Sequence, residues 1–266
     1  MAKPSDRLDY QSFYGQRRES TYGRDYTLQQ AEQHSFYPVL RKFVTQYQLE
    51  DKSCLEIGSS GGMFQDVVKD YYGTDISSEL AQHYHKPYRV AEGATYPFAD
   101  AMFDAIWSHA VFEHIPDLQT ALNEVVRLLR PGGYLLFAPA WQCRPWAAEG
   151  YPVRPYSDFG LGGKLVKASI PLRDSVLWRS LFIFPKRAWR HLQFLVGRRF
   201  RQFPYRRLRA NYERFWMSDS DACNSIDPHD AILWFESHGL RCLSHPLHWR
   251  AFWVRTGGLV FQKRAP

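Results

Sequence analysis

Short apolar runs follow one another at regular intervals along the first half of the chain. Each has four to six residues and ends at glycine, proline or polar positions, which is typical of buried strands. The pattern predicts strands at Ser53–Ile57, Tyr71–Ile76, Tyr88–Ala91, Phe103–Ser108 and Tyr134–Pro139.

Helical patterns separate these strands. Apolar residues recur at spacings of three and four residues, which predicts helices over Leu28–Leu49, Phe64–Val68, Ser77–Tyr84 and Leu118–Leu129. The last of these stops before Pro131-Gly132-Gly133. Strands that alternate with helices indicate a parallel sheet with right-handed crossovers.

The alternation stops near Trp141. A helix predicted over Pro228–His238 and two strands at Arg241–His245 and Gly258–Gln262 resume it. We therefore expect residues 1–140 to form an N-terminal arm, polar over its first 30 residues, and a ligand-binding core. Residues 141–222 form an insertion, and residues 223–266 close the same core.

Composition indicates an ordinary globular protein. Of the 266 residues, 45% are hydrophobic and 23% are charged, which excludes a disordered or fibrous chain. The formal net charge of +7 is uneven, because eleven Lys/Arg residues and one acid, Asp174, lie between Arg173 and Arg209. The basic character therefore belongs to the insertion.

The cysteines and the N-terminus indicate in which cellular compartment the protein is expected. No Cys-x-x-Cys pair exists, so we expect reduced thiols and no metal site, with His245 and His248 structural. The N-terminus lacks a signal-peptide core, and no run reaches the ~18 apolar residues that span a bilayer. These features predict a cytoplasmic protein, with peripheral contact to the inner membrane surface left open.

A glycine-rich loop carries the first chemical signal. Residues 56–62 read Glu-Ile-Gly-Ser-Ser-Gly-Gly between a strand and a helix, where glycines let the backbone approach a ligand. Asp75 ends the next strand, nineteen residues after Glu56, where it can accept hydrogen bonds from both ribose hydroxyls. A dinucleotide fold uses the same geometry, and a tight turn without ligand is the simplest alternative.

The residues after Asp75 help to decide what kind of ligand this loop binds. Residues 92–108 lead to Phe112-Glu113-His114-Ile115, and residues 128–135 read Leu-Leu-Arg-Pro-Gly-Gly-Tyr-Leu. From Ser53 to Pro139 this succession resembles the class I S-adenosylmethionine-dependent methyltransferases, in the subgroup that modifies small molecules, lipids and sugars. The resemblance implies a doubly wound, Rossmann-like α/β sheet of seven strands in the order 3-2-1-4-5-7-6, the last antiparallel. It also implies S-adenosyl-L-methionine as cofactor and S-adenosyl-L-homocysteine as product.

The same resemblance implies roles for individual residues. The loop would hold the methionine part of the cofactor, the next acid and its neighbour the ribose and adenine, and the third motif the adenine amino group. Ser60 stands where the family has its middle glycine, and Glu92 where Asp is commoner. The implied cofactor residues are Glu56, Gly58, Ser59, Ser60, Gly62, Asp75, Ile76, Glu92, Gly93 and, at the mouth, Ser108.

A hydroxyl acceptor needs a base, and three residues are candidates. His109 and His114 follow the fourth strand, near where a methyl group would be delivered, and a histidine near neutral pKa suits this role. Asp221, in a run with Asp219 that closes the insertion, is the third; this pair could also hold sugar hydroxyls or a metal, or cap a turn. Structural roles are the alternative for each. The absence of Asn/Asp-Pro-Pro-Tyr after the fourth strand argues against methylation of a nucleobase amine.

The insertion holds the candidate acceptor contacts. Trp141, Trp146, Tyr151 and Tyr156 suit a sugar ring or an apolar chain, or else pack a lid onto the core. Val176–Phe203 mixes basic residues with Trp and Phe, which fits a helix or hairpin on an anionic membrane, a phosphate-binding segment or a solvated lid. Pro185 is expected to break this helix in two.

We therefore predict an S-adenosylmethionine-dependent methyltransferase that methylates a sugar hydroxyl on a glycan or glycolipid. The tail from Trp141 resembles methyltransferases found with polysaccharide-biosynthesis enzymes, which favours that acceptor. A small natural product, a quinone-like lipid or, less favoured, RNA are alternative acceptors. A catalytically inactive interaction subunit of the same fold is the alternative outside enzymes.

Overall fold

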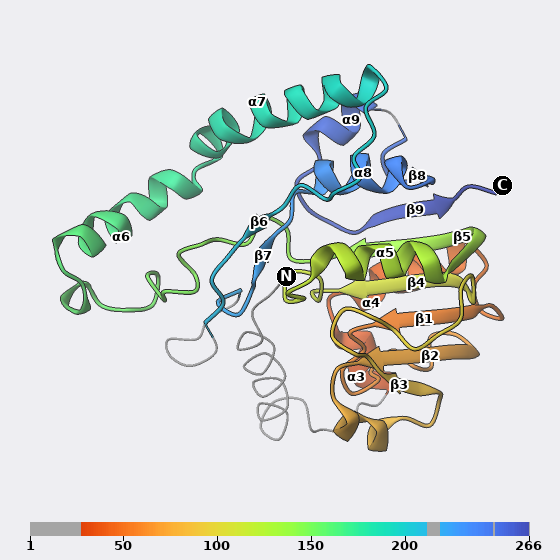
Figure 1. The fold of residues 1–266 in the computed structure, drawn as a ribbon. Helices are drawn as coiled ribbons and strands as arrows, with labels where there is room; N and C mark the ends of the chain where they lie inside the picture. The colour runs from red at the N-terminus through yellow and green to blue at the C-terminus, as the bar shows by residue number, and fades with distance from the viewer. Residues whose placement is uncertain (1–27, 212–218, 247, 266) are drawn as a thin grey trace.

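The computed structural model describes residues 28–211, 219–246 and 248–265, so most of the predicted N-terminal arm lies outside it. Its centre is a seven-stranded sheet in the order β3-β2-β1-β4-β5-β9-β8 (Figure 1). β9 is antiparallel to both of its neighbours, and the first five strands are parallel. This confirms the predicted doubly wound sheet and its order. The strands are β1 Ser53–Ile57, β2 Asp70–Asp75, β3 Tyr88–Val90, β4 Phe103–His109, β5 Leu129–Ala138, β8 Leu240–Cys242 and β9 Leu259–Lys263.

Two apolar cores cover the two faces of the sheet. Side chains alternate across each strand, so in β5 Leu135 and Phe137 enter one core and Leu136 and Ala138 the other. The first core holds the apolar faces of α5 (Leu118–Leu128) and α8 (Pro228–Ser237). The second holds those of α3 (Leu28–Gln33) and α4 (Tyr37–Gln46). Burial on both faces explains why the central strands read as continuous apolar runs.

Three predicted helices differ in the structure. The helix expected over Leu28–Leu49 is two helices, because Pro38 starts α4 at its first turn. No helix forms over Phe64–Val68, where bonds such as Gln65 N–H to Gly62 O close successive turns instead. The segment after β2 is a short 3₁₀ helix, η1 (Ser78–His83).

The insertion leaves the sheet after β5 and is helical, as predicted. It holds the short η2 (Tyr156–Asp158), then α6 (Leu161–Asp174) and α7 (Val176–Leu195). In Figure 1, α6 lies to the left of the sheet and α7 runs above α8. It returns through a two-stranded ribbon of β6 (Arg206–Arg207) and β7 (Asn224–Ser225). A further helix, α9 (His248–Trp253), which the sequence did not indicate, lies between β8 and β9.

The predicted break at Pro185 is wrong. α7 continues through this proline, and the break lies at Ser175, whose hydroxyl accepts a hydrogen bond from Trp178 N–H at 3.2 Å. Pro185 is exposed, so the lost backbone hydrogen bond costs less there than on a buried face. Within the described ranges, no helix combines the length and apolar character needed to cross a bilayer.

Candidate functional site

A cavity of about 310 Å³ lies where β1, β2 and β4 end. This is the carboxyl edge of the parallel strands, at the point where the strand order reverses, and open α/β sheets bind ligands there. Nine of the predicted site residues line it: Glu56, Gly58, Ser59, Ser60, Asp75, Ile76, Gly93, His109 and His114.

The loop after β1 needs its first glycine for two reasons. Gly58 has a φ of +73°, and a Cβ there would lie 2.1 Å from Cγ2 of Val111. Ser60, at the position of the family's middle glycine, also has a positive φ, +45°. A residue with a side chain can adopt this conformation at a small cost, so the turn survives the substitution.

Tyr84 holds this loop from the side of η1. Its hydroxyl lies 2.7 Å from Oγ of Ser59 and 2.8 Å from the carbonyl oxygen of Ser60. A Cβ at Gly73 would come within 2.6 Å of the Tyr84 ring, so a glycine in β2 makes room for it. Tyr84 was not predicted from the sequence, since the contact joins positions about 25 residues apart.

Asp75 is fixed at the end of β2 by backbone donors. Its Oδ2 accepts a hydrogen bond from Ser60 N–H at 3.0 Å, and its Oδ1 accepts one from Ile76 N–H at 2.7 Å. Each carboxylate oxygen can accept more than one hydrogen bond. The carboxylate is therefore pre-positioned beside the cavity for a pair of hydroxyl donors.

Glu56 is the buried acid of the cavity wall. It is 5% exposed and accepts a hydrogen bond from the Tyr71 hydroxyl at 2.5 Å. Burial raises the pKa of this carboxyl to about 8. Its proton is therefore easily released when a cationic ligand group comes near.

Three predicted cofactor residues are not among the residues that line the cavity. Gly62 lies behind the loop, where a Cβ would meet the Tyr84 ring at 2.8 Å. Glu92 is exposed, in a turn closed by its N–H and the carbonyl of Thr95 at 3.0 Å. Ser108 is 1% exposed within β4, between β1 and β5.

His109 faces the cavity from the end of β4 in aromatic surroundings. Its ring stacks on Phe36 with centroids 4.3 Å apart, and the edge of His34 lies 5.6 Å away. Burial, and next the neighbouring His34, lower the pKa of His109 to about 4. His109 is therefore neutral at pH 7 and a weak proton acceptor. His34, which also lines the cavity, was not predicted.

His114 meets two carboxyl groups. Its Nε2 lies 3.6 Å from Oε1 of Glu113, and its Nδ1 lies 3.8 Å from Oδ1 of Asp221. Asp221 reaches this place from the end of the insertion, because the next N–H groups, of Cys223 and Asn224, both donate to the Glu113 carbonyl at 2.9 Å. The structure thus joins two of the three predicted base candidates and adds Glu113, whose pKa burial raises.

The four predicted acceptor aromatics take part in packing contacts. Trp141 donates its indole N–H to the Gly257 carbonyl at 2.8 Å, and Tyr151 stacks on Phe159 with centroids 4.6 Å apart. Trp146 lies beside the guanidinium of Arg144, and Tyr156 lies beside the ammonium of Lys167. None of the four is among the described residues that line the cavity.

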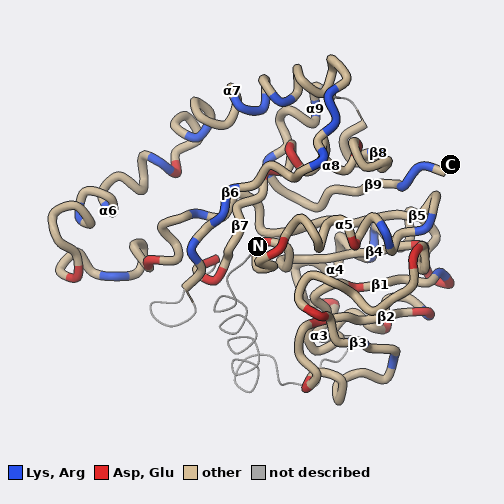
Figure 2. The backbone as a smooth tube through the Cα atoms, in the orientation of Figure 1, with Lys and Arg blue, Asp and Glu red and all other residues tan. Residues whose placement is uncertain are grey.

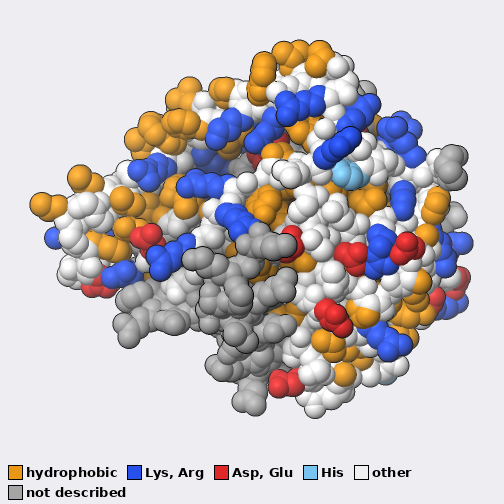
Figure 3. Space-filling model, in the orientation of Figure 1, with side chains coloured by type: hydrophobic (Ala, Val, Ile, Leu, Met, Phe, Trp, Pro, Cys, Tyr) orange, Lys and Arg blue, Asp and Glu red, His pale blue; other side chains and the backbone are white. Residues whose placement is uncertain are grey.

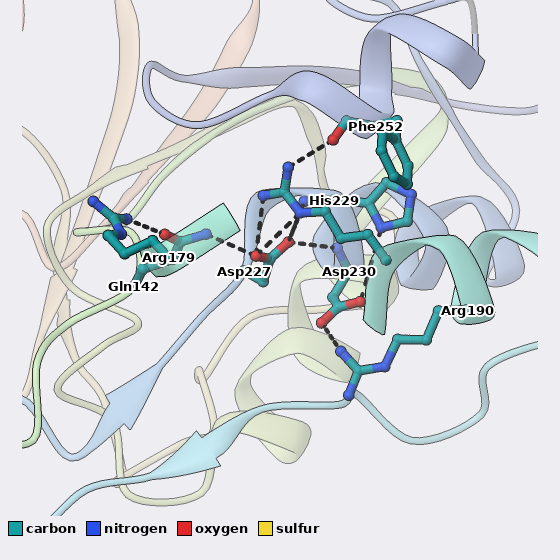
Figure 4. Close-up of polar contacts among 8 residues, drawn as sticks. Gln142, Arg179, Arg190, Asp227, His229, Asp230 and Phe252 are labelled. Atoms are coloured by element: carbon teal, nitrogen blue, oxygen red, sulfur yellow. Dashed lines mark hydrogen bonds and ion pairs between the residues drawn. The ribbon is translucent and has the colours of Figure 1, made fainter. Parts of the chain in front are cut away.

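A buried polar cluster joins α7 to the start of α8 (Figure 4). Arg187, 2% exposed, lies 3.0 Å from Asp227 and donates to the Phe252 carbonyl at 2.7 Å. Arg190 pairs with Asp230, and Asp227 also caps α8 through His229 N–H.

In the same cluster, Asp227, His229 and Asp230 lie close enough to offer ligand atoms to one ion, a grouping that the sequence did not suggest. Arginines already neutralise both carboxylates. We therefore interpret the cluster as an ion-pair network that fixes the insertion to the core.

The comparisons with known proteins agree with this geometry. Residues 55–137 match the family model described as "Methyltransferase domain". Malonyl-[acyl-carrier protein] O-methyltransferase 1 of Coxiella burnetii is 32% identical over 90 residues, which are 32% of this chain and 32% of that protein. Phthiotriol/phenolphthiotriol dimycocerosates methyltransferase 1 of Mycobacterium ulcerans is 28% identical over 141 residues, 46% of this chain and 52% of that protein.

A solved structure of a SAM-dependent methyltransferase from Methanosarcina mazei covers 84% of this chain and 98% of that chain, at 16% identity and a TM-score of 0.47. The chain matches a third to a half of the length of the two curated relatives.

The matched segment carries the glycine loop, Asp75 and His114 on the sheet just described. The match to the methyltransferase domain model over residues 55–137, together with the strand order, supports the resemblance to class I S-adenosylmethionine-dependent methyltransferases. The cofactor of this class is S-adenosylmethionine. The cavity fits it, because a fixed carboxylate suits ribose hydroxyls and a buried carboxyl suits a cationic amino-acid end.

Proposed function

We propose that this protein transfers a methyl group from S-adenosylmethionine to an oxygen atom of a small-molecule or lipid acceptor. One observation carries the proposal. The cavity at the switch point of the sheet is lined by Asp75 and Glu56 and also by His114. A cofactor site and a proton acceptor are therefore adjacent.

The relatives support this class of acceptor. One is named an O-methyltransferase of malonyl-[acyl-carrier protein], and the other a methyltransferase of phthiotriol/phenolphthiotriol dimycocerosates, which are lipids. Their names favour a small-molecule or lipid acceptor here without fixing which one.

The protein's part in the chemistry is to position and to accept a proton. Bound S-adenosylmethionine supplies an activated methyl group on a sulfonium sulfur. Asp75 would hold the ribose hydroxyls, and Glu56 would face the cationic end of the cofactor. The apolar cavity walls would exclude water from the transfer.

His114 is the base that the geometry favours. An acceptor hydroxyl at the cavity would give its proton to the imidazole, and Asp221 and Glu113 would stabilise the imidazolium that forms. His109 suits this role less, because a group with a pKa of about 4 accepts a proton poorly at pH 7. We assign it to the cavity wall beside Phe36.

The finer proposal is that the acceptor is a sugar hydroxyl on a glycan or glycolipid. It rests on the resemblance of the tail to polysaccharide-biosynthesis methyltransferases and on the aromatic residues of the insertion. Trp146 and Tyr156 would bind such an acceptor outside the cavity. Neither of the two relatives described above has a name that mentions a sugar.

An experiment with methyl-labelled S-adenosylmethionine tests both the proposed class of acceptor and the finer proposal of a sugar hydroxyl. The protein is incubated with a host extract, which is then divided into lipid, polysaccharide, small-molecule, RNA and protein fractions. Label in the lipid or small-molecule fraction supports the proposed acceptor class, and label that moves to free sugars after glycan hydrolysis supports the finer proposal. Label in RNA alone would overturn the acceptor. No label in any fraction, with S-adenosylhomocysteine still bound, would favour an inactive interaction subunit.

A further inference from the structure

We propose that the outer face of α7 docks on an anionic lipid membrane. The outer face is defined by Leu177, Trp178, Leu181, Phe182, Pro185, Trp189, Leu192 and Leu195. These positions follow a helical spacing of three and four residues, and all are apolar. Leu177 is 81% exposed, Leu181 69% and Trp189 62%, so the described chain does not cover this face.

The opposite face of α7 fixes this orientation. Arg179 donates to Gln142, Arg187 pairs with Asp227, and Arg190 pairs with Asp230. Three cations of the helix are thus bonded on its inner side, two of them to acids of the core. Because these bonds hold the polar side inward, the helix cannot roll to bury its apolar side, and the exposure is a built feature of the fold.

Neighbouring aromatic residues widen the apolar surface. Trp249 and Trp253 of α9 are 62% and 58% exposed, and Phe184 of α7 contacts Trp253 with ring centroids 4.8 Å apart. Figure 3 shows hydrophobic side chains along the outer edge of the molecule over α6 and α7, with basic side chains directly beside them. Tryptophan at such a border suits the interface between lipid tails and headgroups.

The positive charge around the outer face of α7 favours an anionic membrane as its partner. Between residues 176 and 209 the sequence holds no Asp or Glu (Figure 2). Lys186 is exposed on α7, and Arg198, Arg199 and Arg201 are exposed just after it. An apolar helical face bordered by exposed cations is typical of a helix that lies in the plane of an anionic membrane. A second copy of this chain would bring the same positive charge against itself, which favours lipid over self-association.

Docking of α7 on a membrane deepens the proposed function and rests on it for the lipid acceptor. The two proposals are tested by different measurements. A lipid acceptor, as the proposed function allows, would be reached from the membrane on which the insertion rests. Binding to vesicles needs neither cofactor nor turnover, so each proposal can fail without the other.

The test is co-sedimentation of the whole protein with vesicles. We expect binding to phosphatidylcholine vesicles that contain roughly one-third phosphatidylglycerol, and weak binding to phosphatidylcholine alone. Leu181→Glu/Leu192→Glu, two exposed positions of the outer face, is expected to weaken this binding by at least about tenfold. Val39→Glu, at an exposed apolar position on α4, is the matched control and should bind as the wild type does.

The fold is checked by S-adenosylhomocysteine binding and thermal unfolding, which the double variant should leave unchanged. Failure of the wild type to bind the anionic vesicles would overturn the proposal, as would equal binding by the double variant. Sedimentation velocity without lipid measures whether the protein associates with itself. A dimer that the double variant dissociates would show that a second copy covers this face instead.

Discussion

His109 ends β4 and His114 follows it five residues later, and their neighbours give them different chemistry. His109 is enclosed by Phe36 and His34, and that burial lowers its pKa to about 4. His114 lies within 3.8 Å of two carboxyl groups and lines the same cavity. Sequence alone left the two equivalent, because neither the aromatic ring nor the acid from the insertion is adjacent in the chain.

Replacement of the two histidines should separate these roles. His114→Ala is expected to lower the methyl-transfer rate about 100-fold at pH 7, which is the usual contribution of a general base. His109→Phe keeps the stacking on Phe36 and should retain most of the rate. Turnover is measured as transfer of label from methyl-labelled S-adenosylmethionine to the acceptor, and S-adenosylhomocysteine binding should be unchanged in His114→Ala. Equal loss in both variants would contradict the assignment of the base.

Glu56 should make stability depend on pH in the ligand-free protein. Its folded-state pKa of about 8 is above the ordinary value of 4.5, so the folded state binds the proton more tightly. The free energy of unfolding should therefore fall as pH rises from about 4.5 to 8. Glu56→Gln removes this dependence, so its melting temperature, compared with that of the wild type, should be relatively higher at pH 9 than at pH 5. A constant difference between the two proteins would show that Glu56 does not titrate in this way.

Some site residues could be predicted from the sequence, and others could not. Asp75 and the loop residues were predictable because each stands at a fixed place relative to a strand end. Tyr84, His34 and Glu113 were not singled out, since their role depends on contacts across η1, α3 and the end of the insertion. Glu92 was predicted from the family position, but its side chain lies in an exposed turn.

At the scale of elements, the insertion is held to the core by ion pairs. Arg187→Ala is expected to lower the free energy of unfolding by about 3 kcal/mol, because it leaves the part-buried Asp227 without its cation. Lys186→Ala, at the exposed neighbouring position, should change it by less than about 0.5 kcal/mol. The measurement is denaturant unfolding.

Asp227→Asn completes a double-mutant cycle with Arg187→Ala. The double variant should lose clearly less stability than the sum of the two single variants, since each single change already breaks the pair. Additive losses would mean that the Arg187–Asp227 pair does not couple α7 to α8. Asp227→Asn can still cap the helix, which keeps the cap out of the comparison.

The spacing of apolar residues predicted some helices and strands correctly and others wrongly. The buried strands were visible as apolar runs, and α5 and α8 as segments with apolar residues at helical spacing. Phe64–Val68 has helical spacing, but the glycines before it and the close packing of Tyr84 leave the chain in turns. Proline disfavours the interior of a helix, which predicts a break at Pro185, but α7 continues through this exposed position, where the lost backbone hydrogen bond costs less.

For the whole molecule, the sequence located the insertion but not its arrangement. The loss of alternation after Trp141 marked where the chain leaves the sheet. The strand order came from the family resemblance, because residues alone do not say which strand is adjacent to which. The packing of α7 above α8 arises from charges about 40 residues apart, which no local pattern shows.

Calorimetric titration with S-adenosylhomocysteine tests the central claim, that the sheet edge holds this cofactor. We expect binding by the wild type, and about 30-fold weaker binding by Asp75→Ala, which loses charged hydrogen bonds worth about 2 kcal/mol. Asp70→Ala removes an exposed acid at the other end of the same strand and should bind as the wild type does. No binding by the wild type, or equal binding by Asp75→Ala, would contradict the account.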